Sequence, residues 1–94
     1  MTLRANSHAL MRRAIRTAYR RAIDAHTVED AVRHHSELVD LLSIEAMIVR
    51  TSAQSEENKE AALKDINASA TYHRDAVDRL TDIIESKVHL VWRP

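Results

Sequence analysis

The chain contains no glycine, and its only proline is the last residue, Pro94. Tight hairpins and irregular loops depend on these two residue types, because glycine adopts positive φ angles and proline presets the bend of a turn. A fold of strands joined by short turns is therefore not expected. With 94 residues, of which 45% are hydrophobic, the chain is long enough for one small core. We expect a single helical domain over residues 1–94.

The expected core is thin and aliphatic, because the only aromatic residues are Tyr19, Tyr72 and Trp92. A core of this size gives limited stability by itself. The absence of cysteine excludes disulfides, thiolate catalysis and cysteine-based metal sites. The absence of glycine excludes a phosphate-binding loop and a nucleophile elbow. We therefore predict a protein that is not an enzyme and that needs no cofactor.

The start of the sequence does not resemble a secretion signal. Residues 1–10 contain several polar residues and one arginine where a signal peptide has an apolar stretch. No run along the chain is long and apolar enough to predict a membrane span. A cytoplasmic location is the resulting expectation.

Apolar residues recur with a helical period in three segments, at about 7–25, 28–50 and 56–88. The first apolar stripe is mostly alanine, which predicts a close approach to another helix with little buried area. Thr27 and Ser55 each precede acidic residues in the next turn, which is typical of a helix start. Weak helix formers between Asn67 and Thr71 could divide the third segment, but its heptad phase is unbroken. We expect three helices rather than four.

The second and third segments carry apolar seams that match each other in reverse order. In an antiparallel pair of helices, the numbers of facing residues have a constant sum. Here Val28 with Leu80, His35 with His73 and Leu42 with Ile66 add to 108, and Val32 with Val77, Val39 with Ala70 and Ala46 with Leu63 add to 109. The reversal then falls at Gln54, inside a polar stretch that interrupts the helical pattern. These seams predict an all-α, antiparallel up-down-up three-helix bundle built on a long helical hairpin.

His35 and His73 face each other in this register and form the first candidate site. Two imidazoles on facing helices bind a metal such as zinc when one or two further ligands project into the same layer. No Glu-x-x-His motif occurs, and no other donor has a matching position. The alternative is a partly buried polar layer of hydrogen-bonded rings, which would be sensitive to acid. We expect the polar layer and keep the metal site as an alternative.

The first helical segment is strongly basic. Residues 1–26 hold six arginines and one acidic residue, a local charge of +5, whereas the remaining residues hold eight basic and thirteen acidic residues, a charge of −5. Arg12, Arg13, Arg16 and Arg20 form a contiguous face opposite the alanine stripe. Such a face can bind the phosphates of a nucleic acid or another anion. It can equally meet solvent or an acidic protein surface, and the neutral overall charge favours this second reading.

The third segment is longer than the other two, so apolar positions near its C-terminal end are expected to remain uncovered. The predicted protein-interaction residues are Ile84, Val88, Leu90, Val91 and Trp92. Residues 89–94 form an unusually apolar tail that either folds back onto the bundle or docks into a partner through Trp92.

Together these features predict a non-catalytic helical protein that associates with itself or docks into a larger protein complex, for example a multi-subunit particle. The first alternative is a small nucleic-acid-binding module that uses the arginine-rich first helix. The second alternative is a metal-binding helical bundle lined by His35 and His73.

Overall fold

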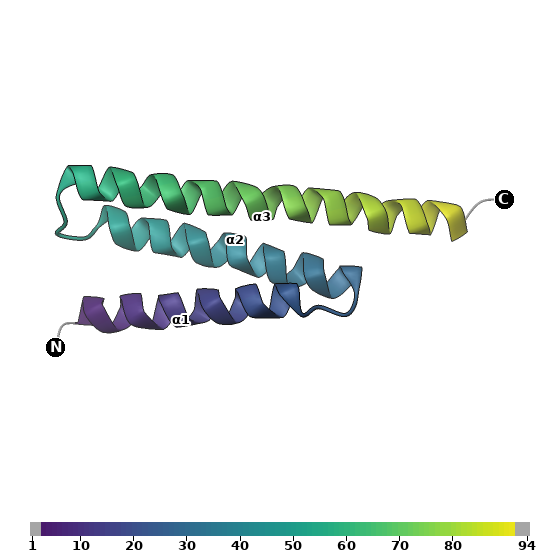
Figure 1. Ribbon diagram of the computed structural model, residues 1–94, viewed down its shortest axis with the longest axis horizontal. Coiled ribbons are helices and arrows are strands. Elements are labelled where there is room, and N and C mark those ends of the chain that lie inside the picture. The colour runs from purple at the N-terminus through teal and green to yellow at the C-terminus, as the bar shows by residue number, and fades with distance from the viewer. Residues whose placement is uncertain (1–2, 92–94) are drawn as a thin grey trace.

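The computed structural model describes the backbone of residues 3–91 and the side chains of residues 9–87. Its elements are α1 (Leu3–Ile23), α2 (Val28–Arg50) and α3 (Glu56–Val91), and no strand occurs in the described backbone. The three helices run up, down and up along the long axis of the molecule (Figure 1). The predicted all-α, antiparallel three-helix bundle is therefore confirmed.

Both predicted helix starts on the hairpin are confirmed by side-chain caps. Thr27 has an extended backbone, with φ −127° and ψ 157°, and its hydroxyl accepts a hydrogen bond from the amide of Asp30 at 3.0 Å. Ser55 caps α3 in the same way by accepting a bond from the amide of Asn58 at 3.2 Å. These bonds satisfy amides that have no partner within the helix, which is why α2 and α3 begin at these positions.

The first helix differs from the prediction at both ends. It begins at Leu3 rather than near Ser7, and it ends at Ile23 rather than at Ala25. The amide of Asp24 still bonds to the carbonyl of Arg20 at 2.9 Å, but the following residues leave the helix. The reason is the extended conformation of Thr27, because the chain needs the residues before this cap to reverse its direction.

The third helix is continuous over 36 residues, so Asn67 and Thr71 do not divide it. It also continues to Val91, beyond the predicted end near residue 88. In the predicted register Leu80 lies opposite the start of α2, so residues 81–91 extend past that helix by about 16 Å at 1.5 Å per residue. Figure 1 shows this C-terminal part of α3 reaching beyond both other helices.

The core consists of two clusters that share α2. One joins α2 to α3 through Leu42, Ala46, Val49, Ile66 and Ala70. The other joins α1 to α2 through Ala18, Ala22 and Leu38. Partly buried Ile15 of α1 packs against both clusters. Two of the predicted facing pairs, Leu42 with Ile66 and Ala46 with Leu63, lie in the first cluster, and His35 contacts His73, as the expected register requires.

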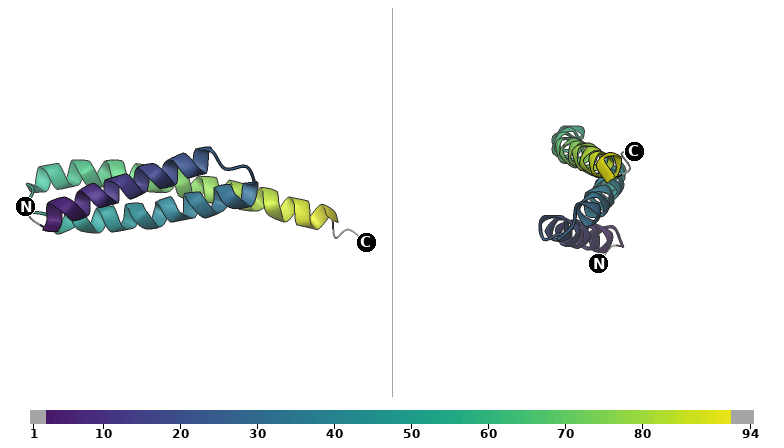
Figure 2. Two further views of the ribbon diagram at one scale, coloured as in Figure 1. Left: turned by 90° about the horizontal axis from the view of Figure 1, so that it is seen from below. Right: turned by 90° about the vertical axis from the view of Figure 1, so that its right-hand side faces the viewer.

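The middle position of α2 leaves an open side between the two outer helices. Both α1 and α3 pack against α2, but no Cα atom of α1 comes within 8 Å of one in α3 over the described residues. The Cα trace measures 61 × 23 × 15 Å, so the molecule is a thin, elongated layer. The end-on view in Figure 2 shows α2 between the other two helices. Side chains therefore have to bridge the space between α1 and α3.

None of these helices, over the part of the chain that the structure describes, has a stretch long and apolar enough to cross a membrane.

Leu38 of α2 packs against Ala18 and Ala22 and so holds α1 in place. It is 1% exposed and has the largest fully buried side chain among the described residues. We expect Leu38→Ala to lower the free energy of unfolding by about 3 kcal/mol, since it removes apolar contacts and leaves a cavity. Urea denaturation followed by circular dichroism measures this change. Met47→Ala, at a side chain that is 62% exposed, is the control and should cost less than about 1 kcal/mol. Equal losses in both variants would contradict the assigned core.

Candidate functional site

The structure places His35 of α2 and His73 of α3 in direct contact. Their Nδ1 atoms lie 2.8 Å apart, and the ring centroids are 5.0 Å apart with an interplanar angle of 34°. His73 is 5% exposed, whereas His35 is partly buried. The distance is that of a hydrogen bond in which the Nδ1–H of one neutral ring donates to the Nδ1 of the other. The predicted pairing of these two residues is therefore present.

This hydrogen bond constrains the charge of the pair, because it requires one Nδ1 without a proton. Burial lowers the pKa of His35, and the charge of neighbouring His34 lowers it further. Burial also lowers the pKa of His73, with a second contribution from the charge of His35. Two protonated rings would lose the hydrogen bond and place two positive charges side by side. The layer is consequently stable in its neutral form.

The geometry of the pair differs from that of two ligands sharing a zinc ion. Two nitrogens that bind zinc at 2.0–2.1 Å in a tetrahedral site lie about 3.3 Å apart, which is longer than the 2.8 Å seen here. Among the described residues, no group of three or more histidine, aspartate or glutamate side chains is placed to hold a metal ion. His35 and His73 thus form a polar layer in this arrangement.

Two tyrosines extend the histidine pair toward α1. The ring of Tyr19 meets His73 edge-on, with centroids 6.0 Å apart, and Tyr72 packs against His73 in the same manner at 5.1 Å. Because Tyr19 belongs to α1 and His73 to α3, this contact bridges the two helices whose backbones stay apart. The polar layer therefore connects all three helices.

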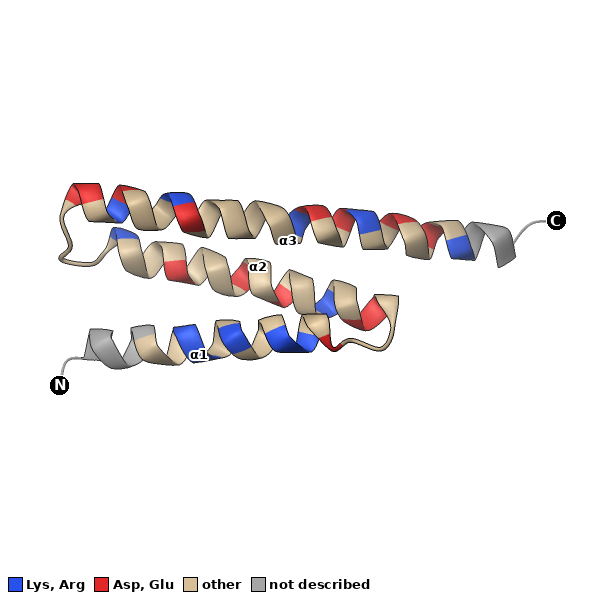
Figure 3. Ribbon diagram, viewed as in Figure 1, with Lys and Arg blue, Asp and Glu red and all other residues tan. Residues whose placement is uncertain are grey.

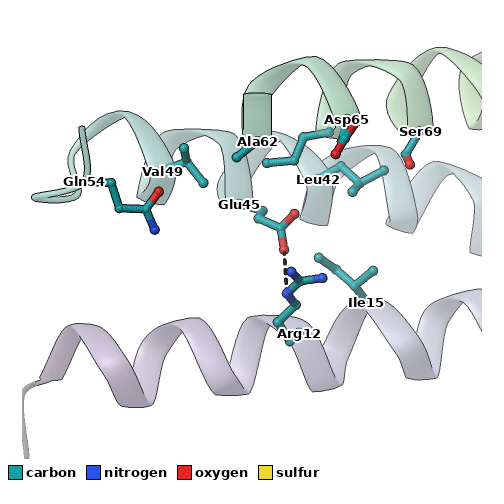
Figure 4. Close-up of a pocket in the computed structure, with 10 residues that line it drawn as sticks. Arg12, Ile15, Leu42, Glu45, Val49, Gln54, Ala62, Asp65 and Ser69 are labelled. Atoms are coloured by element: carbon teal, nitrogen blue, oxygen red, sulfur yellow. Dashed lines mark ion pairs between the residues drawn. The ribbon is translucent and has the colours of Figure 1, made fainter. Parts of the chain in front are cut away.

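A cleft of about 390 Å³ lies on the open side, between α1 and α3 and above α2. Its lining residues come from all three helices and from the turn before α3, and they are Arg12, Ile15, Leu42, Glu45, Val49, Gln54, Ala62, Asp65, Ile66 and Ser69. Arg12 and Glu45 point toward each other across this cleft (Figure 4). The cleft thus combines apolar walls with three charged side chains.

Glu45 is the unusual member of the cleft, because it is a carboxylate that is only 6% exposed. Its Oε2 lies 3.8 Å from Nε of Arg12 and accepts no hydrogen bond from any described residue. A buried charge without hydrogen bonds destabilises a fold, so such groups are enriched at functional sites. Sequence reasoning missed this residue. The available signal was its spacing, since Glu45 continues the apolar stripe of Leu38, Leu42 and Val49.

The predicted arginine face is divided by the structure. Arg12 points into the cleft, whereas Arg13, Arg16 and Arg20 are exposed and make no ion pair with any described side chain. Figure 3 shows that basic residues dominate α1, whereas acidic residues are frequent on α2 and α3. The basic surface that remains available is therefore formed by Arg13, Arg16 and Arg20.

Of the predicted interaction residues near the C-terminus, Ile84 is partly buried, and its neighbour Ile83 is 44% exposed. The side chains of Val88, Leu90, Val91 and Trp92 lie outside the described residues. Large exposed apolar side chains outside this C-terminal set are Leu10, Tyr19, Ile23, Ile44, Met47 and Tyr72. They come from all three helices, so the exposed apolar surface is not confined to the end of α3.

The histidine layer predicts a loss of stability in acid. Both folded-state pKa values lie below the ordinary value of 6.5, so the unfolded chain binds more protons as pH falls through this value. The free energy of unfolding should therefore be highest above pH 6.5 and decrease below it. Urea denaturation at a series of pH values measures this slope.

The double variant His35→Leu/His73→Leu separates this effect from the titration of carboxylates at lower pH. Its free energy of unfolding should change less than that of the wild type between neutral pH and the range where carboxylates begin to titrate. If both proteins show the same acid sensitivity, the histidine layer is not its source.

Glu45 predicts a gain in stability when its charge is removed. Glu45→Met keeps the helix propensity and the approximate size of the side chain, and it should raise the free energy of unfolding by about 1 kcal/mol or more. Glu60→Met changes an exposed residue on α3 and should alter stability by less than about 0.5 kcal/mol. Thermal and urea denaturation compare the two. A less stable Glu45→Met variant would show that the contact with Arg12 stabilises the carboxylate.

Comparison of the chain with known protein families, curated proteins and solved structures finds no match. The candidate sites are therefore defined by the contacts and charges of this chain alone: the histidine layer, the Glu45 cleft and the basic surface of α1.

Proposed function

We propose that the protein is a non-catalytic assembly protein that associates with further copies of itself or docks into a larger protein complex. The observation that carries this proposal is the open side between α1 and α3, which is flanked by large apolar side chains. Monomeric proteins rarely expose contiguous apolar patches larger than a few hundred Å², and larger patches mark interaction sites.

Four exposed side chains define this open face. Tyr19 and Ile23 of α1 are 49% and 64% exposed, and Tyr72 and Ile83 of α3 are 60% and 44% exposed. Tyrosine and isoleucine supply large contact areas, and tyrosine is enriched at interface positions that contribute most to binding. These four residues therefore have the character of an interface.

Helical periodicity places the four residues beside the cleft. Tyr19 and Ile23 follow Arg12 by seven and eleven residues, so the three share one side of α1. Tyr72 and Ile83 follow Asp65 by seven and eighteen residues and share one side of α3. Arg12 and Asp65 both line the cleft. The open face therefore continues the cleft along the same side of the molecule.

The composition of the core also favours a partner. The buried apolar residues are Ala18, Ala22, Leu38, Leu42, Ala46, Val49, Ile66, Ala70 and Ala76, and five of these nine are alanine. Alanine buries little area, so the isolated chain gains little hydrophobic stabilisation from them. The broad side of the molecule measures 61 × 23 Å. That area is sufficient for a typical interface of about 800 Å² per partner.

The charge distribution favours one arrangement of two copies. Residues 9–23 of α1 contain five arginines and no acidic residue, whereas residues 56–87 of α3 contain eight acidic and five basic residues. A twofold axis parallel to the helices puts α1 of each copy over α3 of the other and pairs opposite charges. An axis perpendicular to the helices within the layer would put arginine against arginine. The first arrangement is therefore the one we propose for a dimer.

Charges placed on the open face should prevent this association. We expect Tyr72→Lys/Ile83→Lys to have the mass of a single chain under conditions where the wild type forms a larger species, because lysine is costly to bury at an interface. Light scattering coupled to size exclusion measures the mass. Asn67→Lys/Thr71→Lys adds the same charge at exposed positions outside the open face of α3 and should keep the wild-type mass.

Circular dichroism of both double variants establishes that they remain helical. A wild-type protein that is a stable single chain at micromolar concentration and retains no partner in affinity purification would contradict the assembly proposal.

The second candidate function is binding of a nucleic acid through α1. The exposed side chains of Arg13, Arg16 and Arg20, which pair with none of the side chains at residues 9–87, favour it, because clustered arginines neutralise phosphates. The ultraviolet absorbance ratio recorded during the mass measurement detects bound nucleic acid. Retention on a nucleic-acid column that decreases with salt and is lost in Arg16→Gln/Arg20→Gln, but not in Arg74→Gln/Arg79→Gln, would establish this function instead.

A further inference from the structure

We propose that the cleft between α1 and α3 binds an organic cation, a guanidinium or ammonium group on a short alkyl stem, with Glu45 as its anionic partner. The cleft has a volume of about 390 Å³. This volume falls in the range of small-molecule sites, about 300–1,000 Å³. The inference goes beyond assembly, because it assigns a ligand chemistry to a cleft formed by a single chain.

The carboxylate of Glu45 determines the sign of the ligand charge. Its side chain is 8% exposed, and its Oε2 accepts no hydrogen bond from the described residues. A buried carboxylate requires donors, and a guanidinium or ammonium group supplies several together with the opposite charge. An anionic ligand would instead meet a buried negative charge. The site therefore selects cations.

Arg12 does not complete this site in the described arrangement. Its Nε lies 3.8 Å from Oε2 of Glu45, beyond hydrogen-bonding distance, and its side chain is 62% exposed. Only the Arg12 side of this pair is exposed, and a ligand cation that takes its place would restore a positive charge beside buried Glu45. Arg12 thus lies at the mouth of the cleft, where a ligand would compete with it for Glu45.

The other lining residues fit the same ligand. Asp65 adds a second carboxylate, so the charged residues of the cleft are two acids and one base. Ser69 and Gln54 add a hydroxyl and an amide that can accept further hydrogen bonds. The walls formed by Ile15, Leu42 and other aliphatic side chains can pack against the alkyl stem. The cleft therefore offers contacts to both parts of an alkyl cation.

The probe for this site is n-butylguanidinium, and n-butylurea is its neutral counterpart of nearly the same shape. Titration of the isotope-labelled protein, followed by amide chemical shifts, should show saturable changes at Ile15, Leu42 and Ile66 with the cation. The neutral compound should bind at least about tenfold more weakly, since it lacks the charge-assisted contact with Glu45.

Three variants test the assignment of Glu45. Glu45→Gln should weaken binding of n-butylguanidinium by about tenfold or more. Glu60→Gln, which removes an equal charge at an exposed position of α3, should leave it unchanged. Arg12→Gln should bind a few-fold more tightly, because it removes the competing cation and keeps Glu45 in place.

Several results would overturn the proposal. They are the absence of saturable shifts at the cleft residues, equal binding of n-butylurea, equal weakening by Glu45→Gln and Glu60→Gln, or loss of binding in Arg12→Gln. The last result would show that Arg12 supports the site instead of competing with the ligand for Glu45. Circular dichroism of the variants confirms that each comparison is made on folded protein.

Mass measurement then identifies the source of the cation. If Glu45→Gln lowers the mass of the assembly and Glu60→Gln does not, the natural cation is a basic side chain of a second copy. If neither variant changes the mass while the wild-type protein binds the probe, the natural cation does not come from a second copy. Probe binding does not require assembly, so a wild-type protein that is monomeric and retains no partner would contradict the proposed function without affecting this inference.

Discussion

The antiparallel packing of α2 against α3 sets the register on which the main core cluster and the histidine pair depend. Heptad spacing repeats one face of a helix every seven residues, so a single register brings Leu42 beside Ile66 and His35 against His73. A shift of the two helices by one turn would bury different residues and separate the histidines. Because α1 then packs on α2 alone, the same register also leaves the side of α3 that faces α1 without a helix in backbone contact.

The core contains two ionisable groups whose burial reduces the stability available from a small set of apolar contacts. His73 is 5% exposed and remains compatible with the fold because His35 satisfies its Nδ1. Glu45 is 6% exposed and has no equivalent partner, although it lies on the same helix as His35. The two histidines hydrogen-bond to each other, whereas Oε2 of Glu45 accepts no hydrogen bond from the described residues. This difference is the physical reason why the cleft carries the stronger argument for a ligand.

The features that depend on spacing along one helix could be predicted from the sequence. The bounds of α2, the caps at Thr27 and Ser55 and the pairing of His35 with His73 all follow from local chemistry and a constant register. The cleft could not be predicted from the sequence, because it depends on the angle at which α1 crosses α2. That angle decides that Arg12 meets Glu45 instead of joining the exposed arginines, and no pattern within α1 encodes it.

The proposed assembly face and the proposed cation site share one structural element, which is the position of α1. Its contacts with α2 centre on Ala18 and Ala22, so little buried area holds it in place. The ring contact of Tyr19 with His73 connects it to α3. The cleft and the open face both lie between α1 and α3, so a ligand that fixes this spacing also fixes the shape of the face that a partner would meet. If a ligand in the cleft changes the affinity for a partner by some factor, the partner changes the affinity for the ligand by the same factor, as thermodynamic linkage requires.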